Sequence, residues 1–363
     1  MKRVCVLLRS LAPGGAEKQA LLLAHALQEE HEPYLVLLSE EPRNTRHLAF
    51  IADHRIRTEF LPSNPLRKVA RLRSFLNRER IDSLFCFLPS DTLIGALVGR
   101  CSRVRRVYGG LRNTRLRRHK EWSLRLVHNH VLDYTISNSH EAVRFFSGRG
   151  FQRDKFLVVP NGIFVRPPAT PRPPSDVVHL MTVGRFVEEK DFHTALKSLR
   201  RVLDHNELRS QVRYLIVGCG PIEDRIRRWT GELGLQAEVE LVIDPPDLEP
   251  LYAQADIYLS TSLYEGLSNS IMEAMNFGLP VVATNVGDNA SLVKEGVNGY
   301  LAPIRDVEHL AKRLSELLRA RELRMRYGAA SHHILEQGYS FETLRQAYSK
   351  LLREEPTAQP GAI

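Results

Sequence analysis

The chain has 363 residues, too many for one ordinary hydrophobic core, and this length predicts two α/β domains. With 43% hydrophobic residues it is a globular protein, and its longest apolar runs, such as residues 4–8 and 34–38, are too short to span a bilayer. The net charge is +9, but residues 1–174 carry +15 and the remainder carries −6. The N-terminal half is therefore expected to meet something anionic: a phosphorylated ligand, a membrane surface or nucleic acid.

The chain begins with MKR and continues directly into an apolar strand, so we expect no secretory signal and a cytoplasmic protein. The four cysteines, Cys5, Cys86, Cys101 and Cys219, are scattered, and no pair has the spacing of metal ligands. This pattern favours buried free thiols in a reducing compartment.

The first half of the chain alternates between predicted strands and predicted helices. Strands are predicted for RVCVLL, PYLVLLS, SLFCFL and DYTISNS, and helices for GAEKQALLLAHALQEE and TLIGALVGRC. Such alternation predicts a parallel, doubly wound sheet.

A proline-rich stretch, FVRPPATPRPPSD at residues 164–176, cannot form a central strand or a helix interior and therefore predicts a linker. After it the alternation resumes with the strands VVHLMTVGRF, VRYLIVGCG, VELVI, IYLSTS and PVVAT, and amphipathic helices at 308–319 and 341–353 close the chain. Ligands bind at the carboxyl ends of the strands in open α/β sheets, so two such domains facing each other predict a binding cleft.

The predicted organisation has five parts. They are an N-terminal Rossmann-like domain at 1–163, the linker at 164–176, a C-terminal Rossmann-like domain at 177–337, a helix at 338–354 returning to the N-terminal domain, and a disordered tail at 355–363.

Two glycine-containing turns follow predicted strands. Gly14 and Gly15 let the backbone approach a ligand in front of a helix N-terminus, although an ordinary strand-to-helix turn explains them equally well. Gly218 and Gly220 have the spacing of a dinucleotide fingerprint, but Glu223 occupies the third glycine position and would repel a pyrophosphate. We interpret this second turn as one that lies near a ligand, without the dehydrogenase function.

Two further segments carry charged residues at strand ends. VGRFVEEKD presents Arg185 and Lys190, which could hold two phosphates or could simply be solvated. In YEGLSNSIMEAM, Ser268 is the predicted N-cap of a helix that runs to about Phe277, and the N–H groups of its first turn favour phosphate.

Two glutamates bracket the start of this predicted helix. Glu273 leans back toward the helix N-terminus, and Glu265 comes from the preceding loop. Carboxylates near a phosphate make sense if they accept hydrogen bonds from the hydroxyls on both sides of the diphosphate in a nucleotide sugar. The alternative is an ordinary N-cap with two solvated glutamates.

The motifs GGAEK, VPNGI at 159–163, VGRFVEEKD, VGCGP and YEGLSNSIMEAM occur in this order along the chain. As a set they resemble the retaining glycosyltransferases of family 4, which have the GT-B fold, from residue 2 to about residue 352. The resemblance implies transfer of a hexosyl or N-acetylhexosaminyl group, with retention, from a nucleotide-diphosphate sugar, UDP-sugar being favoured. It implies a glycan or lipid-linked acceptor, as in lipopolysaccharide or polysaccharide biosynthesis, and no cofactor.

The family's functional residues carry over position by position. Arg185 and Lys190 match the residues that hold the donor diphosphate, Glu273 matches the residue that binds the ribose, and Glu265 matches the residue that contacts the donor-sugar hydroxyls. The resemblance thus assigns catalysis to Glu265, Arg185 and Lys190. It assigns the rest of the donor site to Gly14, Gly15, Gly218, Gly266, Leu267, Ser268 and Asn269.

Many family members have a histidine near the reacting sugar carbon. Here His119, His128, His130 and His140 are candidates, and we select His119 because it lies in a basic loop after a strand, although a surface histidine is the ordinary alternative. The chain has no Asp-x-Asp motif, so we expect no metal site, with protein cations in place of the metal.

Basic residues concentrate in two segments of the N-terminal half. Residues 64–80 place Leu66, Val69, Leu72 and Leu76 on or near one helical face among six Arg and Lys residues, and residues 112–127 add more cations and Trp122. This pattern fits a packed amphipathic helix with a solvated basic face. It fits equally a surface that lies on anionic lipid and collects a lipid-linked acceptor.

Two other functions remain open. A nucleic-acid-binding protein would explain the charge but not the ordered motifs, and no interleaved aromatic and basic signature is present, so we expect no nucleic-acid partner. A GT-B-shaped sugar-nucleotide epimerase would turn over a nucleotide sugar without an acceptor. A phosphorylase would need a pyridoxal lysine, for which the sequence offers no context.

Overall fold

The computed structural model describes residues 1–112, 116, 118–168, 175–204, 209 and 211–354. The chain folds into two compact units: an N-terminal unit of residues 1–163 together with the chain from Tyr339 onward, and a C-terminal unit of Phe164–Gly338. The predicted linker begins where the C-terminal unit begins, and its residues 169–174, like the predicted tail, lie outside the described residues.

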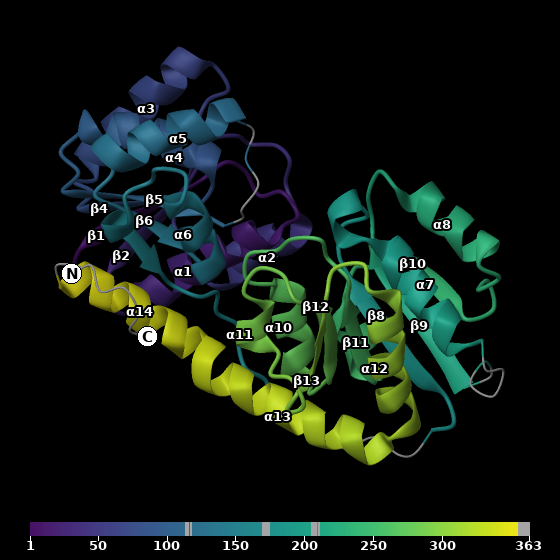
Figure 1. Cartoon of the computed structure of the whole chain (residues 1–363). Coiled ribbons are helices and arrows are strands. Elements are labelled where there is room, and N and C mark those ends of the chain that lie inside the picture. The colour runs from purple at the N-terminus through teal and green to yellow at the C-terminus, as the bar shows by residue number, and fades with distance from the viewer. Residues whose placement is uncertain (113–115, 117, 169–174, 205–208, 210, 355–363) are drawn as a thin grey trace. The chain divides into compact units, whose positions relative to one another are not determined.

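The N-terminal unit is built on a parallel sheet (Figure 1). Its strands are β1 (Arg3–Leu8), β2 (Glu32–Leu37), β3 (Thr58–Phe60), β4 (Ser83–Cys86), β5 (Arg106–Leu111), β6 (Tyr134–Ser137) and β7 (Phe156–Val158). Its α-helices are α1 (Gly15–Ala26), α2 (Thr45–Asp53), α3 (Pro65–Arg78), α4 (Pro89–Arg100), α5 (Arg118–His130), α6 (His140–Ser147) and α14 (Phe341–Arg353), with short 3-10 turns at Leu27–Glu29 and Arg153–Lys155.

The strand order in this sheet is β3-β2-β1-β4-β5-β6-β7, so the chain switches direction across the sheet between β1 and β4. Figure 1 shows α3, α4 and α5 on one face of the sheet, with α1, α2 and α14 on the other. Val6 therefore packs toward α1 and α14, while its neighbour Leu7 packs toward α3 and α4. Because both faces are covered, β1 is a continuous apolar run.

The helix α14 belongs to the core of the N-terminal unit. Leu344, Tyr348 and Leu352 are buried in the same hydrophobic cluster as the residues of β1 and α1. Arg345 and Arg353 form ion pairs with the carboxylate of Glu30, at 2.8 and 2.7 Å. The last described helix of the chain is thus held by apolar packing along one side and by charge at the edge.

The C-terminal unit contains a second parallel sheet with the strand order β10-β9-β8-β11-β12-β13. Its strands are β8 (Val178–Val183), β9 (Val212–Gly218), β10 (Val239–Ile243), β11 (Ile257–Ser260), β12 (Val281–Thr284) and β13 (Gly299–Ala302). Its helices are α7 (Phe192–Val202), α8 (Glu223–Glu232), α9 (Glu249–Gln254), α10 (Asn269–Asn276), α11 (Asn289–Leu292), α12 (Val307–Arg319) and α13 (Arg321–Tyr339), with a 3-10 turn at Glu188–Lys190.

The core of this second unit follows from helical periodicity. On α7, Ala195, Leu199 and Val202 recur along one buried stripe, and this stripe packs with Leu310 and Leu314 of α12. The two helices cover one face of the sheet side by side, over the apolar side chains that the strands direct to that face.

The predicted α/β alternation and two doubly wound parallel sheets are confirmed. The predicted helices at 308–319 and 341–353 are present as α12 and α14, whereas the 19-residue helix α13 was not predicted. The predicted basic loop that contains His119 is wrong for residues 118–122, which belong to the helix α5 at 118–130. This segment is helical because Leu124 and His128 lie one turn apart and are both buried.

The apolar residues of α3 divide between core and solvent, and the prediction of buried cysteines needs correction. The buried face of α3 is Leu72, Phe75 and Leu76, whereas Leu66 is 83% exposed and Val69 46% exposed, because they lie in the first turns, beyond the edge of the core. The four cysteines are free, and Cys5 and Cys86 are buried as predicted. The other two, Cys101 and Cys219, are exposed, because they directly follow the ends of α4 and β9.

Candidate functional site

The candidate site in the C-terminal unit lies at the carboxyl ends of β8 and β11. These neighbouring strands are the point where the strand order reverses, since β9 continues the sheet on one side and β12 on the other. Ligands of open α/β sheets bind at such switch points. The loop after β8 carries Arg185 and Lys190, and the loop after β11 carries Glu265, so two motifs that are 75 residues apart meet here.

Backbone hydrogen bonds hold the two loops together. The amide of Leu263 donates to the carbonyl of Glu189 at 2.8 Å, and the Thr261 hydroxyl donates to the carbonyls of Lys190 and Asp191 at 3.0 and 2.9 Å. Asp191 has φ 45° and caps α7 by accepting from Thr194. The position of Lys190 is therefore set by its backbone neighbours as well as by its charge.

Charged side chains pair across and within these loops. The Nζ of Lys190 lies 2.5 Å from Oε1 of Glu265, which also accepts from the Ser262 hydroxyl at 2.8 Å. Arg185 is 69% exposed and pairs with Glu189 at 3.3 Å. The structure thus brings the predicted phosphate-binding lysine and the predicted sugar-binding glutamate together as an ion pair, and leaves Arg185 largely in solvent.

Close backbone approaches shape this edge of the sheet. Gly218 has φ 149°, and a Cβ there would lie 1.9 Å from the carbonyl oxygen of Gly184, so this glycine allows the β9 turn to pack on the β8 turn. Gly287, which the sequence interpretation missed, has φ 55°. A Cβ at Gly287 would lie 2.5 Å from the carbonyl oxygens of Glu265 and Gly266. The only signal for Gly287 in the sequence is a glycine after the strand PVVAT.

Helix α10 begins where the sequence predicts. Ser268 is the N-cap, with extended backbone dihedrals, but its hydroxyl makes no capping hydrogen bond within the described chain and instead lies 3.2 Å from the hydroxyl of Ser270. The helix therefore begins with Asn269 without a side-chain cap from Ser268. Its positive end lies at the same loop as Glu265, because Leu267 and Gly266 are the residues between them.

Glu273 is held by a tyrosine that the sequence interpretation missed. The Tyr252 hydroxyl donates to Oε2 of Glu273 at 3.0 Å. Burial first, and then the neighbouring Glu273 carboxylate, raises the pKa of Tyr252 well above its ordinary value, so the phenol stays protonated and donates. Glu273 is thereby oriented one turn into α10, on the same helix whose first residue follows Ser268.

The remaining predicted residues belong to the N-terminal unit. Gly14 is the N-cap of α1, with extended backbone, and Gly15 is its first residue. His119 is exposed near the start of α5, as are His130 at its end and His140 at the start of α6.

His128, by contrast, is fully buried. Its ring nitrogens lie 2.7 Å from the Thr135 hydroxyl and 2.9 Å from the carbonyl oxygen of Gln152. Burial lowers the pKa of His128 to about 4. His128 is thus a neutral core residue, which excludes it from the role considered for these histidines.

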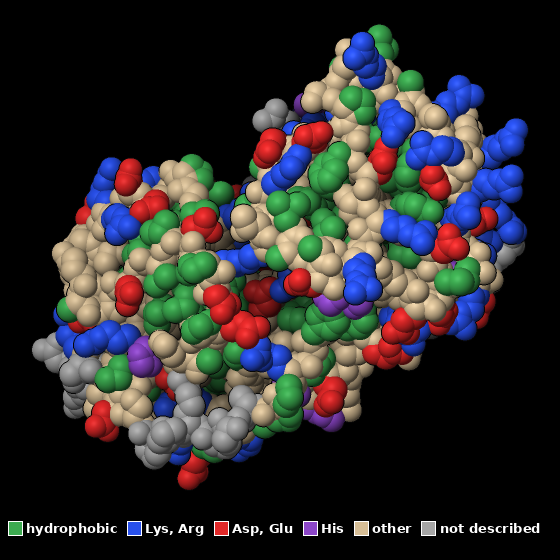
Figure 2. All heavy atoms as spheres, turned by 180° about the vertical axis from the view of Figure 1, so that it is seen from behind, with side chains coloured by type: hydrophobic (Ala, Val, Ile, Leu, Met, Phe, Trp, Pro, Cys, Tyr) green, Lys and Arg blue, Asp and Glu red, His purple; other side chains and the backbone are tan. Residues whose placement is uncertain are grey.

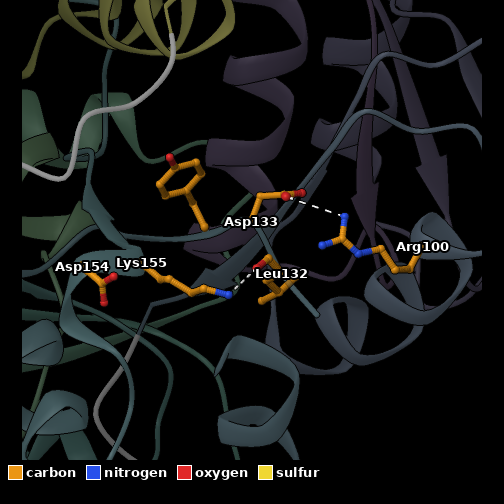
Figure 3. A pocket seen from close by; sticks show the side chains of 6 residues that line it. Arg100, Leu132, Asp133, Asp154 and Lys155 are labelled. Carbon is orange, nitrogen blue, oxygen red and sulfur yellow. Dashed lines mark hydrogen bonds and ion pairs between the residues drawn. The ribbon is translucent and has the colours of Figure 1, made fainter. Parts of the chain in front are cut away.

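A cavity of about 340 Å³ lies at the edge of the N-terminal sheet where the strands begin, at the amino ends of β6 and β7 (Figure 3). Asp133 pairs there with Arg100 at 3.6 Å, and the Lys155 ammonium donates to carbonyl oxygens in the last turn of α5 and to that of Leu132, just beyond the helix. These contacts hold the fold together. The residues that line the cavity belong to none of the sequence motifs, so the cavity is not the site that those motifs predict. Within the described residues, no three His, Cys, Asp or Glu side chains are grouped to hold a metal ion.

Two family models match the chain. The model described as Glycosyltransferase Family 4 matches residues 13–165, and the model described as Glycosyl transferases group 1 matches residues 169–333. Together they leave out only residues 1–12, 166–168 and 334–363.

Curated relatives match shorter stretches. The chain is 30% identical over 183 residues to LpsE of Rhizobium meliloti, named as a lipopolysaccharide core biosynthesis glycosyltransferase, which covers 50% of this chain and 52% of the relative. It is 34% identical over 161 residues to WcaL of Salmonella typhimurium, named for colanic acid biosynthesis, which covers 40% of this chain and 37% of the relative. The chain thus spans about half the length of these curated relatives or less.

A solved structure matches along nearly the whole chain. The crystal structure of Anabaena HepE in complex with UDP-glucose superposes with a TM-score of 0.85 at 21% identity, and the match covers 97% of this chain and 99% of HepE. This likeness confirms the predicted fold class, α/β with two Rossmann-like domains in the GT-B fold. With family models matching both of its halves, the chain belongs to the GT-B glycosyltransferases of the family 4 type.

Proposed function

We propose that this protein transfers a sugar, a hexosyl or N-acetylhexosaminyl group, from a nucleoside diphosphate sugar to a hydroxyl of a glycan or lipid-linked acceptor. The favoured donor is a UDP-sugar. The transfer retains the anomeric configuration and uses no metal and no cofactor. The N-terminal unit serves the acceptor, and the C-terminal unit binds the donor.

The observation that carries this proposal is the meeting of Arg185, Lys190 and Glu265 at the β8 and β11 switch point, beside the start of α10. Negative charge develops on the diphosphate as it leaves, and cations already in place stabilise that charge without reorganisation. The α10 N-terminus adds its dipole to theirs. Glu273 accepts from the ribose hydroxyls, held in position by Tyr252.

The Lys190–Glu265 ion pair fits both assigned roles. Each group neutralises the other until a ligand arrives, so neither is left as an uncompensated, partly buried charge. When the diphosphate contacts Lys190, the Glu265 carboxylate gains capacity to accept from the hydroxyls of the donor sugar. The similar fold of HepE, whose structures contain UDP and UDP-glucose, supports the choice of a uridine nucleotide.

A thermal-shift screen of the full chain against UDP-, GDP- and ADP-sugars tests the proposal. A ligand that binds only the folded state raises the melting temperature. At a ligand concentration of one hundred times the Kd, it adds about 2.7 kcal/mol to the free energy of unfolding. NMR of the glycoside formed in the presence of EDTA then reports the anomeric configuration. The proposal is overturned if no nucleotide sugar binds, if the product is inverted, or if the donor is epimerised without an acceptor.

We also propose that the protein acts at the cytoplasmic side of an anionic membrane. The surface made by the helices α3, α4 and α5 supports this. These helices pack in sequence, α3 against α4 and α4 against α5. Their exposed large apolar side chains are Leu66, Val69, Leu97, Trp122 and Leu126. Figure 2 shows Lys and Arg side chains gathered along the upper right edge of the N-terminal unit.

Apolar side chains among cations form the surface that an interfacial helix presents to anionic lipid. In the described parts of the chain, none of the helices combines the length and apolar composition needed to cross a membrane. The exposed apolar and basic side chains of α3, α4 and α5 are the basis on which we propose attachment through this face.

A further inference from the structure

Arg112 carries a partly buried guanidinium, with a buried Nε, that pairs with no acidic side chain in the described parts of the chain. It directly follows β5, and its Nη1 donates to Oδ1 of Asn161 at 2.9 Å, while Nη2 lies 3.5 Å from the Tyr348 hydroxyl and the guanidinium lies 4.2 Å from the ring centroid of Phe87. The buried Nε has no hydrogen-bond partner among the described residues. Glu17 attracts the guanidinium electrostatically, but it does not form an ion pair with it.

A second unsatisfied group lies beside it. Asn138 directly follows β6 and is 5% exposed. Its Nδ2 donates at 3.3 Å to the same oxygen of Asn161 that accepts from Arg112, and its buried Oδ1 has no partner in the described structure. The Nε donor of Arg112 and the Oδ1 acceptor of Asn138 thus both lack a hydrogen-bond partner in the described structure. The two side chains that carry them donate to the same amide oxygen, Oδ1 of Asn161.

These unsatisfied groups are costly to the folded protein. A buried donor or acceptor without a partner lowers the stability of the folded protein, and a buried charge without a counter-charge lowers it further. Burial accordingly lowers the pKa of Arg112. Native proteins leave few such groups, and two neighbouring ones call for a ligand that satisfies both.

The geometry indicates which ligand would do so. The edge of the guanidinium formed by Nε and Nη2 carries no described bond at Nε and only a long contact at Nη2, so a planar or tetrahedral oxyanion can bind there through two oxygens. The Oδ1 of Asn138 accepts from a hydroxyl. An acidic sugar is a small molecule that carries both an anionic group and a hydroxyl, so it could satisfy Arg112 and Asn138 together.

The position agrees with a ligand site. Arg112 and Asn138 follow neighbouring parallel strands, so both lie at the carboxyl edge of the N-terminal sheet, where open α/β sheets bind ligands. Arg112 remains partly exposed as a residue, although its Nε is buried.

We propose that Arg112 and Asn138 bind an acidic sugar unit of the acceptor, with a carboxylate or phosphate on Arg112 and a hydroxyl on Asn138. This inference rests on the proposed function, because that function assigns the acceptor to the N-terminal unit. It adds that the acceptor glycan carries negative charge at the sugar bound beside β5 and β6.

Calorimetric titration of the full chain at low salt tests the inference, with glucuronate, glucose 6-phosphate and glucose as probes. We expect one or both acids to bind at least about tenfold more tightly than glucose, and the two acids distinguish carboxylate from phosphate. Arg112→Gln should abolish the preference. The matched control is Arg106→Gln, which removes an arginine from the other end of β5, where its Nη1 donates to the carbonyl of Glu354.

A second variant covers the case in which Arg112→Gln fails to fold. Asn161→Asp keeps Arg112 and supplies it with a carboxylate at the distance of an existing hydrogen bond, so the chain should fold while acid binding is lost. Acid binding that survives Asn161→Asp, or no preference for acids in the wild type, overturns the inference.

Titration with UDP-glucose and UDP-glucuronate separates this inference from the proposed function. UDP-glucose should bind wild type and Arg112→Gln alike, whereas a failure of every nucleotide sugar in the screen to bind counts against the proposed function. A preference for UDP-glucuronate that depends on Arg112 would assign the acid to the donor and overturn the acceptor assignment.

Discussion

The ammonium group of Lys190 lies 2.5 Å from a carboxylate oxygen of Glu265, although the two residues come from loops that follow different strands. Both side chains are mostly buried, at 20% and 16% exposure. Removing one partner therefore leaves a charge that solvent screens poorly. Arg185, on the same loop as Lys190, has no such constraint because its side chain is largely in solvent.

The two cations should consequently differ in their structural effects. Arg185→Ala and Lys190→Ala should each lower kcat by at least about 10²-fold, since we propose that each stabilises charge on the leaving diphosphate. Only Lys190→Ala should also lower the melting temperature, because Glu265 loses its partner. Steady-state kinetics and calorimetric melting measure both effects, and Glu189→Ala is the control for the loop. Near-normal turnover in both cation variants would remove them from the site.

Substitution of the two glutamates should affect the binding of different ligands. Glu273→Gln should weaken binding of UDP and of the UDP-sugar equally, whereas Glu265→Gln should weaken only the UDP-sugar. Tyr252→Phe deletes the hydrogen bond to Glu273 and should reduce UDP affinity about fivefold, the effect of a hydrogen bond worth about 1 kcal/mol. Calorimetric titration of the three variants tests this. An equal loss of UDP affinity in Glu265→Gln would contradict its assignment to the sugar.

Gly287 should be intolerant of a side chain. Gly287→Ala combines a left-handed backbone with a Cβ that would lie 2.5 Å from the carbonyl oxygens of Glu265 and Gly266, so it should cost about 3 kcal/mol and displace the loop proposed to bind the donor. Gly234 is the matched control, with φ 61° and no described atom within 4 Å of the position a Cβ would take, and Gly234→Ala should cost about 1 kcal/mol. Urea unfolding and UDP titration measure both, and equal costs would refute the packing argument.

Stability should fall in acid because of His128. An ordinary histidine is protonated below pH 6.5, whereas burial lowers the pKa of His128 to about 4 in the folded protein. Between these pH values the unfolded chain binds more protons, so the free energy of unfolding decreases as pH falls from 6.5 to 4, by about 3 kcal/mol at most. Urea unfolding across this range should show a shallower decrease for His128→Gln. Parallel curves for variant and wild type would refute the assignment.

Membrane attachment should depend on both charge and apolar side chains. The chain should sediment with anionic liposomes at low salt and dissociate at high salt, because lysine and arginine each contribute about 1 kcal/mol near an anionic surface. Reversal of four α3 cations to glutamate should abolish sedimentation without affecting UDP binding. The four residues are Arg67, Lys68, Arg71 and Arg73. Leu66→Ser with Trp122→Ser should weaken it at every salt concentration.

The control for charge lies in the other unit, where Arg227 and Arg228 on α8 can be reversed to glutamate. This variant should sediment like the wild type. If the wild type ignores anionic liposomes at low salt, the acceptor is soluble and the basic face serves an anionic glycan.

The alternation of strands and helices is predictable from the sequence, because the apolar period that defines each element is local. A run such as RVCVLL is apolar throughout since it is buried on both faces, and α7 repeats apolar residues at helical spacing since one side packs. The charged residues of the candidate site are recognisable for the same reason: Arg185, Lys190 and Glu273 stand in short motifs at strand ends or on a helix. Local pattern is weaker where charge dominates, and the prediction of a basic loop in place of α5 is wrong for that reason.

Which of these residues meet depends on how the chain folds in three dimensions. The order of strands in the sheet places β8 beside β11, and this contact between distant segments creates the Lys190–Glu265 pair. Tyr252 reaches Glu273 from another helix, and Gly287 is constrained by carbonyl oxygens more than twenty residues earlier in the chain. The unsatisfied atoms of Arg112 and Asn138 exist only because three strand ends converge on Asn161. Such relationships depend on how the sheet assembles, and no local period in the chain records them.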